Sequence, residues 1–77
     1  MKVKDLKTIR VQRGLSHNEI ADSADISRSF YTLIEQGNRT PSMGVAKKIA
    51  NVLELTLDEF FNALEVTKRN IQTNHTA

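Results

Sequence analysis

The stretch between residues 28 and 36 carries several polar side chains that could recognise another molecule through hydrogen bonds. Arg28 ends in a planar guanidinium whose paired donors match the N7 and O6 acceptors of guanine, and Ser29 and Thr32 can bond to bases or phosphates. With about 100° between successive helix residues, the stretch divides into two sides. The polar side holds Arg28, Ser29, Thr32, Leu33 and Gln36, and the apolar side holds Phe30, Tyr31, Ile34 and Glu35. If the apolar side faces a core, the polar side is free to enter a DNA major groove.

Two residues of the polar side each allow more than one interpretation. Arg28 reads a base, or it is only a solvated charge or a phosphate contact. Leu33 is apolar and could touch the methyl group of thymine. It could equally contact the aliphatic part of a neighbouring side chain or a protein partner. Both alternatives are left open by the sequence.

The elements that would position this stretch are two short helices. A Ser-x-x-Glu capping box at residues 16–19 predicts a first helix from His17 to Ala24. Ser27 is the expected cap of a second helix over residues 28–36, and Gly37 can take the left-handed conformation that favours a helix end. Two short helices joined by about three residues make a helix-turn-helix candidate.

Four motifs occur in register along this part of the chain. They read Gly-Leu-Ser-x-x-Glu-Ile-Ala, Ile-Ser-Arg-Ser, Ile-Glu-x-Gly and Arg-x-Pro-Ser. In this pattern the chain resembles the Cro/phage-repressor (XRE-type) helix-turn-helix domains, from Leu6 to about Phe61. The resemblance implies an all-α, compact five-helix lambda-repressor-like DNA-binding domain over residues 1–64. Residues 65–77 have no family counterpart and are expected to be a polar tail, partly helical or disordered.

The remaining helices are predicted from apolar spacing and caps. The first is expected over residues 3–13, with Gly14 as its stop, and the fourth over residues 42–53. A second capping box, at residues 56–59, predicts a fifth helix that runs on toward Asn70. No segment alternates apolar and polar residues with a period of two, so no strand is expected.

Two turns depart from the pattern of the family. Asp25 and Glu54 stand where the family usually has glycine. Asp tolerates the left-handed region better than most residues and Glu less well. The departures therefore bear on the local turn geometry and leave the fold expectation unchanged.

The resemblance also implies a structural ion pair between Arg10 and Glu35. Arg10 follows Ile9 on the flank of the apolar face of the first helix. A partly buried pair would tie this helix to the end of the second motif helix. The alternative is two independent surface charges.

Other polar residues are expected to contact DNA phosphates without reading bases. His17 and Asn18 open the first motif helix, where free N–H groups and the helix dipole favour an anion. The resemblance places Asn38, Arg39 and Thr40 along the DNA backbone, although an ordinary exposed loop is the alternative. The expected phosphate contacts are Arg13, His17, Asn18, Ser27, Asn38, Arg39 and Thr40.

The charge distribution is consistent with a nucleic-acid partner. The formal net charge is only +2, but residues 1–13 carry five Lys and Arg residues against one Asp. A local basic excess suits a phosphate backbone better than the total charge does. No cysteine and only two histidines are present, so a metal site is not expected. No cofactor is expected either.

The last helix suggests how two copies of the chain could associate. Phe61 and Leu64 are apolar residues on a terminal helix, which is a usual way to build a two-fold dimer. Alternatively, both close the core of the single chain.

The sequence predicts a sequence-specific DNA-binding transcriptional regulator, a repressor that binds an inverted-repeat operator as a homodimer. The alternative is an antitoxin-like interaction module that holds a partner protein through the C-terminal helix. An enzyme is disfavoured because the chain has no Cys, no clustered His and no Gly-rich phosphate loop. The chain has no long apolar run and no visible signal peptide, so we expect a cytoplasmic protein without a membrane partner.

Overall fold

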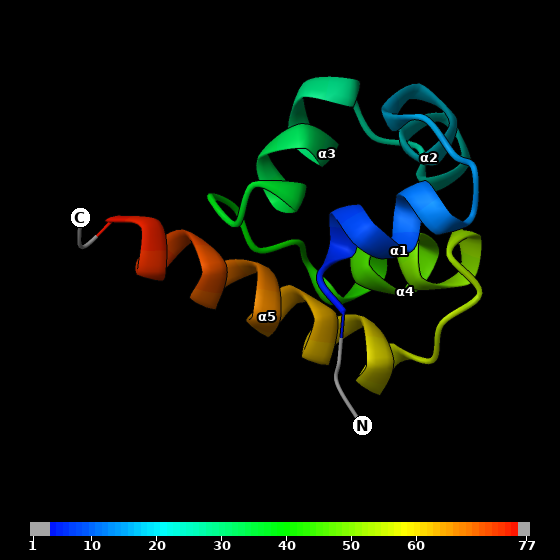
Figure 1. The fold of residues 1–77 in the computed structure, drawn as a ribbon. Helices are drawn as coiled ribbons and strands as arrows, with labels where there is room; N and C mark the ends of the chain where they lie inside the picture. The colour runs from blue at the N-terminus through cyan, green and yellow to red at the C-terminus, as the bar shows by residue number, and fades with distance from the viewer. Residues whose placement is uncertain (1–3, 76–77) are drawn as a thin grey trace.

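Five helices and their connecting turns make up the computed structural model, which describes residues 4–75 and the side chains of residues 4–69. The helices are α1 (Leu6–Gln12), α2 (His17–Ala24), α3 (Arg28–Glu35), α4 (Met43–Val52) and α5 (Leu57–His75). Among residues 4–75 no strand is formed, which confirms the expected all-α architecture of five helices. In Figure 1, α2 and α3 lie together at one end of the molecule and α5 runs across the opposite side.

The two motif helices begin where their caps predict. The Ser16 hydroxyl accepts from the Glu19 N–H at 3.1 Å, and the Glu19 carboxylate accepts from the Ser16 N–H at 2.8 Å. Two otherwise unpaired backbone donors are satisfied in this way. The Ser27 hydroxyl accepts from the Phe30 N–H at 3.0 Å and so caps α3. Gly37 follows α3 with a φ of 79°, in the left-handed region expected for it.

The other helix boundaries differ from the predictions by a few residues. Helix α1 begins at Leu6 because Asp5 is its cap, with a side chain that accepts from the Thr8 N–H at 2.9 Å. The expected start of this helix at residue 3 lies outside the described residues. Ser42 is the cap of α4 rather than its first residue. Helix α5 continues to His75, beyond the expected end near Asn70.

Both turns that lack the family's glycine take the left-handed conformation nevertheless. Asp25 and Glu54 each have a φ of 60°. The N–H that follows each of them reaches back to close its helix: Ile26 donates to the Ala21 carbonyl at 3.0 Å, and Leu55 donates to the Ala50 carbonyl at 2.8 Å. The C-terminal ends of α2 and α4 therefore have the left-handed geometry that glycine usually provides. For Asp25 and Glu54 this conformation costs about 1 kcal/mol or more per residue.

The core is assembled by residues from all five helices, with Tyr31 and Phe60 among its largest fully buried side chains. Helix α2 packs on α3 and α4, and α5 packs on α1, α3 and α4. This arrangement fixes the rotation of α3, because Tyr31 and Ile34 are both fully buried. The polar side of α3 consequently faces outward.

Helix α5 continues to pack on the domain beyond residue 64. The Thr67 side chain is buried, its hydroxyl accepts from the Leu6 N–H at 3.0 Å, and it donates to the Ala63 carbonyl at 3.0 Å. The start of α1 is thus bound to α5 by a hydrogen bond to a residue of the expected tail. Leu64, expected at a subunit interface, is only 3% exposed and belongs to the core of the single chain. The structure corrects that expectation, and of the two candidates only Phe61 keeps part of its surface exposed.

Candidate nucleic-acid interface

The four residues expected to contact bases surround one hollow on the outer side of α3. Arg28, Ser29, Thr32 and Leu33 line this open depression, whose volume is about 430 Å³. Arg28 and Ser29 are exposed, and Thr32 and Leu33 are half-buried. The base-contact candidates therefore form one continuous surface, with the two most exposed residues at the N-terminal end of the helix. In helix-turn-helix proteins that end of the second helix contacts base edges.

A second hollow adjoins the first at Arg28. It has a volume of about 330 Å³ and is lined by Arg10, Ser16, His17, Asn18 and Arg28. This hollow joins the start of α2 to the start of α3, where backbone N–H groups of both helices lack partners within their own helix. The surface presented to a ligand thus includes both helix starts.

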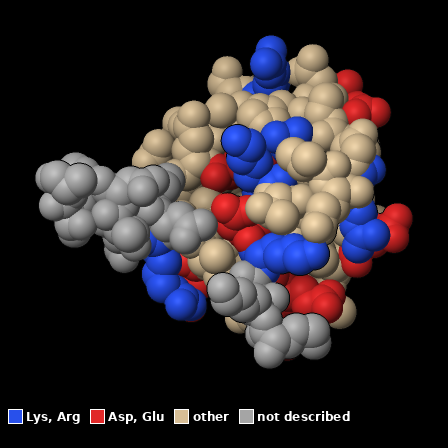
Figure 2. Space-filling view, in the orientation of Figure 1, with Lys and Arg blue, Asp and Glu red and all other residues tan. Residues whose placement is uncertain are grey.

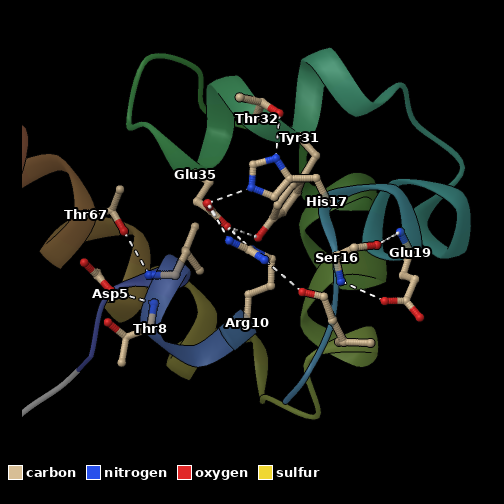
Figure 3. Close-up of polar contacts among 12 residues, drawn as sticks. Asp5, Thr8, Arg10, Ser16, His17, Glu19, Tyr31, Thr32, Glu35 and Thr67 are labelled. Carbon is tan, nitrogen blue, oxygen red and sulfur yellow. Dashed lines mark hydrogen bonds and ion pairs between the residues drawn. The ribbon is translucent and has the colours of Figure 1, made fainter. Parts of the chain in front are cut away.

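Glu35 is the centre of a hydrogen-bonded cluster behind this surface (Figure 3). Its carboxylate accepts from Arg10 Nε at 2.7 Å and from the Tyr31 hydroxyl at 3.1 Å. Its second oxygen accepts from His17 Nε2 at 2.9 Å. Arg10 in turn donates from Nη1 to the Leu15 carbonyl at 2.8 Å. The structure therefore brings Arg10 and Glu35 together in a largely buried pair, with side chains 14% and 8% exposed.

Burial and charge act in opposite directions on Glu35. Burial alone would raise the pKa of its carboxyl, but the hydrogen bonds from Arg10 and His17 and the charge of Arg10 outweigh it and hold the pKa below the usual 4.5. Burial raises the pKa of the Tyr31 hydroxyl above its usual range, and the nearby Glu35 charge adds to that rise. At neutral pH Glu35 is accordingly an ionised acceptor and Tyr31 a protonated donor.

His17 takes part in this cluster, with its side chain 24% exposed. Its Nδ1 is 3.0 Å from the Thr32 hydroxyl and its Nε2 is 2.9 Å from Glu35. The ring stands edge to face on Tyr31, with centroids 5.5 Å apart. Both ring nitrogens have partners within the chain, so a phosphate contact of the ring would have to replace one of them. Its position at the first residue of a helix leaves the direction of the side chain open, and only the packing of α2 on α3 reveals it.

Several other phosphate candidates remain at the surface. Asn18 and Ser27 are exposed at the starts of α2 and α3, and the loop residues Asn38, Arg39 and Thr40 are exposed as well.

Side-chain contacts hold two residues of this loop. The Arg39 guanidinium sits 5.6 Å from the centre of the Phe30 ring, at the edge of α3. Thr40 accepts a hydrogen bond from Lys68 of α5.

Arg13 is bound to a different part of the molecule. Its Nε donates to the Leu53 carbonyl at 3.0 Å, and its Nη1 lies 3.5 Å from the Glu54 carboxylate. Arg13 therefore contributes to holding the turn between α4 and α5. The expected phosphate contact of this residue would require its guanidinium to leave these partners.

Charged side chains of both signs are interspersed on the face shown in Figure 2. A single extended basic patch does not cover that face, in agreement with the small net charge of +2. On that face, attraction to phosphates alone is a weak basis for binding.

Neither a metal-binding cluster nor a membrane-spanning helix is present among the described residues. No group of three or more His, Cys, Asp or Glu in that part of the chain could hold a metal ion. None of the helices within residues 4–75 combines the length and the apolar character needed to cross a membrane.

The chain is similar to known regulators over most of its length. The helix-turn-helix family model HTH_3 matches residues 6–60. The HTH-type transcriptional regulator YqaF of Bacillus subtilis, whose own function is uncharacterised, is 41% identical over 68 residues, which cover 87% of this chain and 90% of YqaF. Control protein C.MunI of a Mycoplasma species is 36% identical over 61 residues, which cover 78% of this chain and 82% of that protein.

A longer relative shares only the corresponding segment. The HTH-type transcriptional regulator PuuR of Escherichia coli is 36% identical over 62 residues, which cover 80% of this chain but 34% of PuuR. No solved structure matches the chain. The match to the family model, the similar regulators and the five-helix fold agree, and the chain belongs to the Cro/phage-repressor (XRE-type) helix-turn-helix family of transcriptional regulators.

Proposed function

We propose that this protein is a sequence-specific DNA-binding repressor that occupies an inverted-repeat operator as a homodimer. The observation that carries the proposal is the common hollow lined by Arg28, Ser29, Thr32 and Leu33 on the outward side of α3. A major groove admits one helix, and its base edges differ in donors, acceptors and methyl groups. The hollow offers a partner for each of these groups.

The roles of the four residues follow from their chemistry. Arg28 donates two parallel hydrogen bonds to a guanine, and Ser29 bonds to a neighbouring base or phosphate. Thr32 and Leu33 lie one turn further along α3, where Leu33 supplies an apolar contact for a thymine methyl group. The half-buried position of Leu33 on the wall of the hollow supports this role over that of a freely exposed side chain.

Phosphate contacts fix the register of α3 in the groove. Asn18 at the start of α2 and Ser27 at the start of α3 lie where partial positive charge gathers at helix ends. The loop residues Asn38, Arg39 and Thr40 would follow the DNA backbone on the other side of α3. Such contacts add affinity and orientation without sequence information.

The homodimer would place two copies of α3 in successive major grooves, roughly 34 Å apart. Phe61 on α5 is the residue we assign to the two-fold interface, because its ring keeps exposed surface while Leu64 is buried. Repression then requires occupancy of a promoter and no chemical step.

Selection from a random-sequence DNA pool at about 0.15 M salt tests the proposal, because non-specific phosphate binding dominates at lower salt. We expect enrichment of an inverted repeat by the native protein. Arg28→Ala should lose preference at one base pair of each half-site. Lys47→Ala removes a positive charge from an exposed position of α4 and should keep the same motif. No enrichment by the native protein would refute the proposal and favour a protein partner instead.

A further inference from the structure

The His17 ring links the centre of the buried cluster to one of the base-contact candidates. Nε2 lies 2.9 Å from the Glu35 carboxylate, and Nδ1 lies 3.0 Å from the Thr32 hydroxyl. The side chain is 24% exposed, and its ring packs against Tyr31. Figure 3 shows the ring between α2 and α3, with Thr32 on one edge and Glu35 on the other. The ring is therefore held in one orientation by three neighbours.

The chemistry of Glu35 determines which ring nitrogen carries the hydrogen. An ionised carboxylate only accepts hydrogen bonds, so Nε2 must be the protonated nitrogen. In a neutral imidazole the other nitrogen then has a lone pair and can only accept. In the neutral ring Nδ1 therefore accepts from the Thr32 hydroxyl, its partner at 3.0 Å, whereas a doubly protonated ring would donate to that hydroxyl.

The Thr32 hydroxyl has a single hydrogen, and His17 engages it. What remains on the oxygen for an external partner is lone pairs. Thr32 lines the hollow on the outward side of α3, so these lone pairs belong to the surface that we propose enters the groove.

We propose that His17 is a positioning residue for DNA recognition, one that makes the Thr32 hydroxyl an acceptor and so directs it to a base amino group. In the major groove this group is N6 of adenine or N4 of cytosine, since guanine and thymine present acceptors only. The inference rests on the proposed function, because it concerns the contact that one residue of α3 makes with a base.

The positions of the hydrogens on the His17 ring can be measured on the protein without DNA. Long-range proton–nitrogen correlation spectra at pH 7.5 distinguish the two neutral forms of a histidine and its doubly protonated form. We expect the form with the hydrogen on Nε2. A hydrogen on Nδ1, or on both nitrogens, would overturn the inference whatever the DNA experiments show.

The contact itself is tested on the selected operator with a base analogue. At the position whose preference Thr32→Val abolishes, the adenine or cytosine is replaced by the analogue that lacks the exocyclic amine. We expect the native protein to bind this duplex roughly threefold to tenfold more weakly, the range of one neutral hydrogen bond. Thr32→Val should bind both duplexes equally. Equal binding by the native protein, or a guanine or thymine preference at this position, would refute the inference.

His17→Phe tests whether the contact between Thr32 and the base amine depends on the ring nitrogens of residue 17. The variant keeps an aromatic ring against Tyr31. With no Nδ1 acceptor, the Thr32 hydroxyl is free to rotate and can donate outward as well as accept, so the loss on removing the amine should be smaller than in the native protein. An unchanged loss in a folded His17→Phe protein would show that His17 does not orient Thr32. If the variant does not fold, the spectra and the Thr32→Val comparison still decide.

Failure of the proposed function and failure of this inference give different results. If the native protein selects no DNA motif, both fall. If it selects an inverted repeat but binds the analogue duplex as tightly as the native operator, the repressor proposal is supported and the proposed role of His17 is refuted.

Discussion

Removing the Arg10 side chain should destabilise the domain far more than removing any exposed lysine. Arg10 makes two hydrogen bonds to Glu35, at 2.7 and 3.4 Å, and a third to the Leu15 carbonyl at 2.8 Å. Arg10→Ala deletes all three and leaves a carboxylate that is 8% exposed without its strongest partner. A buried charge whose partner is removed retains the desolvation cost without the compensating attraction.

The size of the loss follows from the geometry. Breaking a buried ion pair typically costs about 3 to 5 kcal/mol. The lower end applies here because His17 and Tyr31 still donate to Glu35 in the variant. For a domain of this size, a loss of about 3 kcal/mol lowers the melting temperature by roughly 12 to 24 °C.

Thermal and urea unfolding followed by circular dichroism provide the assay. Lys7→Ala is the matched control, because Lys7 is an exposed basic residue of the same helix. Its effect should stay within about 0.5 kcal/mol. Equal melting temperatures for Arg10→Ala and Lys7→Ala would refute the reasoning that the pair with Glu35 stabilises the fold.

Three further predictions concern other parts of the fold. Because the pKa of Glu35 lies below its usual 4.5, the Glu35 carboxyl binds a proton more readily in the unfolded chain than in the folded one. The free energy of unfolding, measured by urea titration, should therefore fall between about pH 6 and about pH 3. The fall should be smaller in Glu35→Gln. A fall of the same size in both proteins would contradict this assignment. Glu54→Gly should raise the free energy of unfolding by about 1 kcal/mol, because glycine adopts the positive φ of this position without strain. Glu54→Ala should not stabilise the protein. Thermal unfolding of the two variants measures the difference. Thr67→Val should cost about 1 to 3 kcal/mol in urea unfolding, since it leaves the Leu6 N–H without its acceptor, and an unchanged stability would show that this bond contributes nothing.

The parts of the fold that local chemistry determines were predictable from the sequence. The Ser16 and Glu19 side chains cap their own helix, so a spacing of three residues was enough to place the start of α2. The apolar spacing of α3 likewise predicted that Tyr31 and Ile34 face the core and that Arg28 faces outward. The pairing of Arg10 with Glu35 came from the family resemblance, because nothing in the local sequence joins two residues so far apart.

The features that were missed depend on how helices pack. The direction of the His17 side chain is decided by α3, which brings Thr32 and Glu35 to the two ring nitrogens. The burial of Leu64 depends on the rotation of α5 on the core, which the apolar spacing of that helix leaves undetermined. The role of Asp5 as the cap of α1 is not evident from the sequence, because the apolar pattern begins earlier and predicts a longer helix.

The measurement that tests the central claim most directly is the specificity ratio at near-physiological salt. It compares the affinity of the native protein for its selected inverted repeat with its affinity for a scrambled duplex of equal length. We expect a ratio of roughly 10³ or more, the range of specific DNA-binding proteins, and a decrease of about 5-fold to 150-fold in Arg28→Ala. A ratio near one, or the same ratio in the native protein and Arg28→Ala, would contradict the account that α3 reads DNA sequence through Arg28.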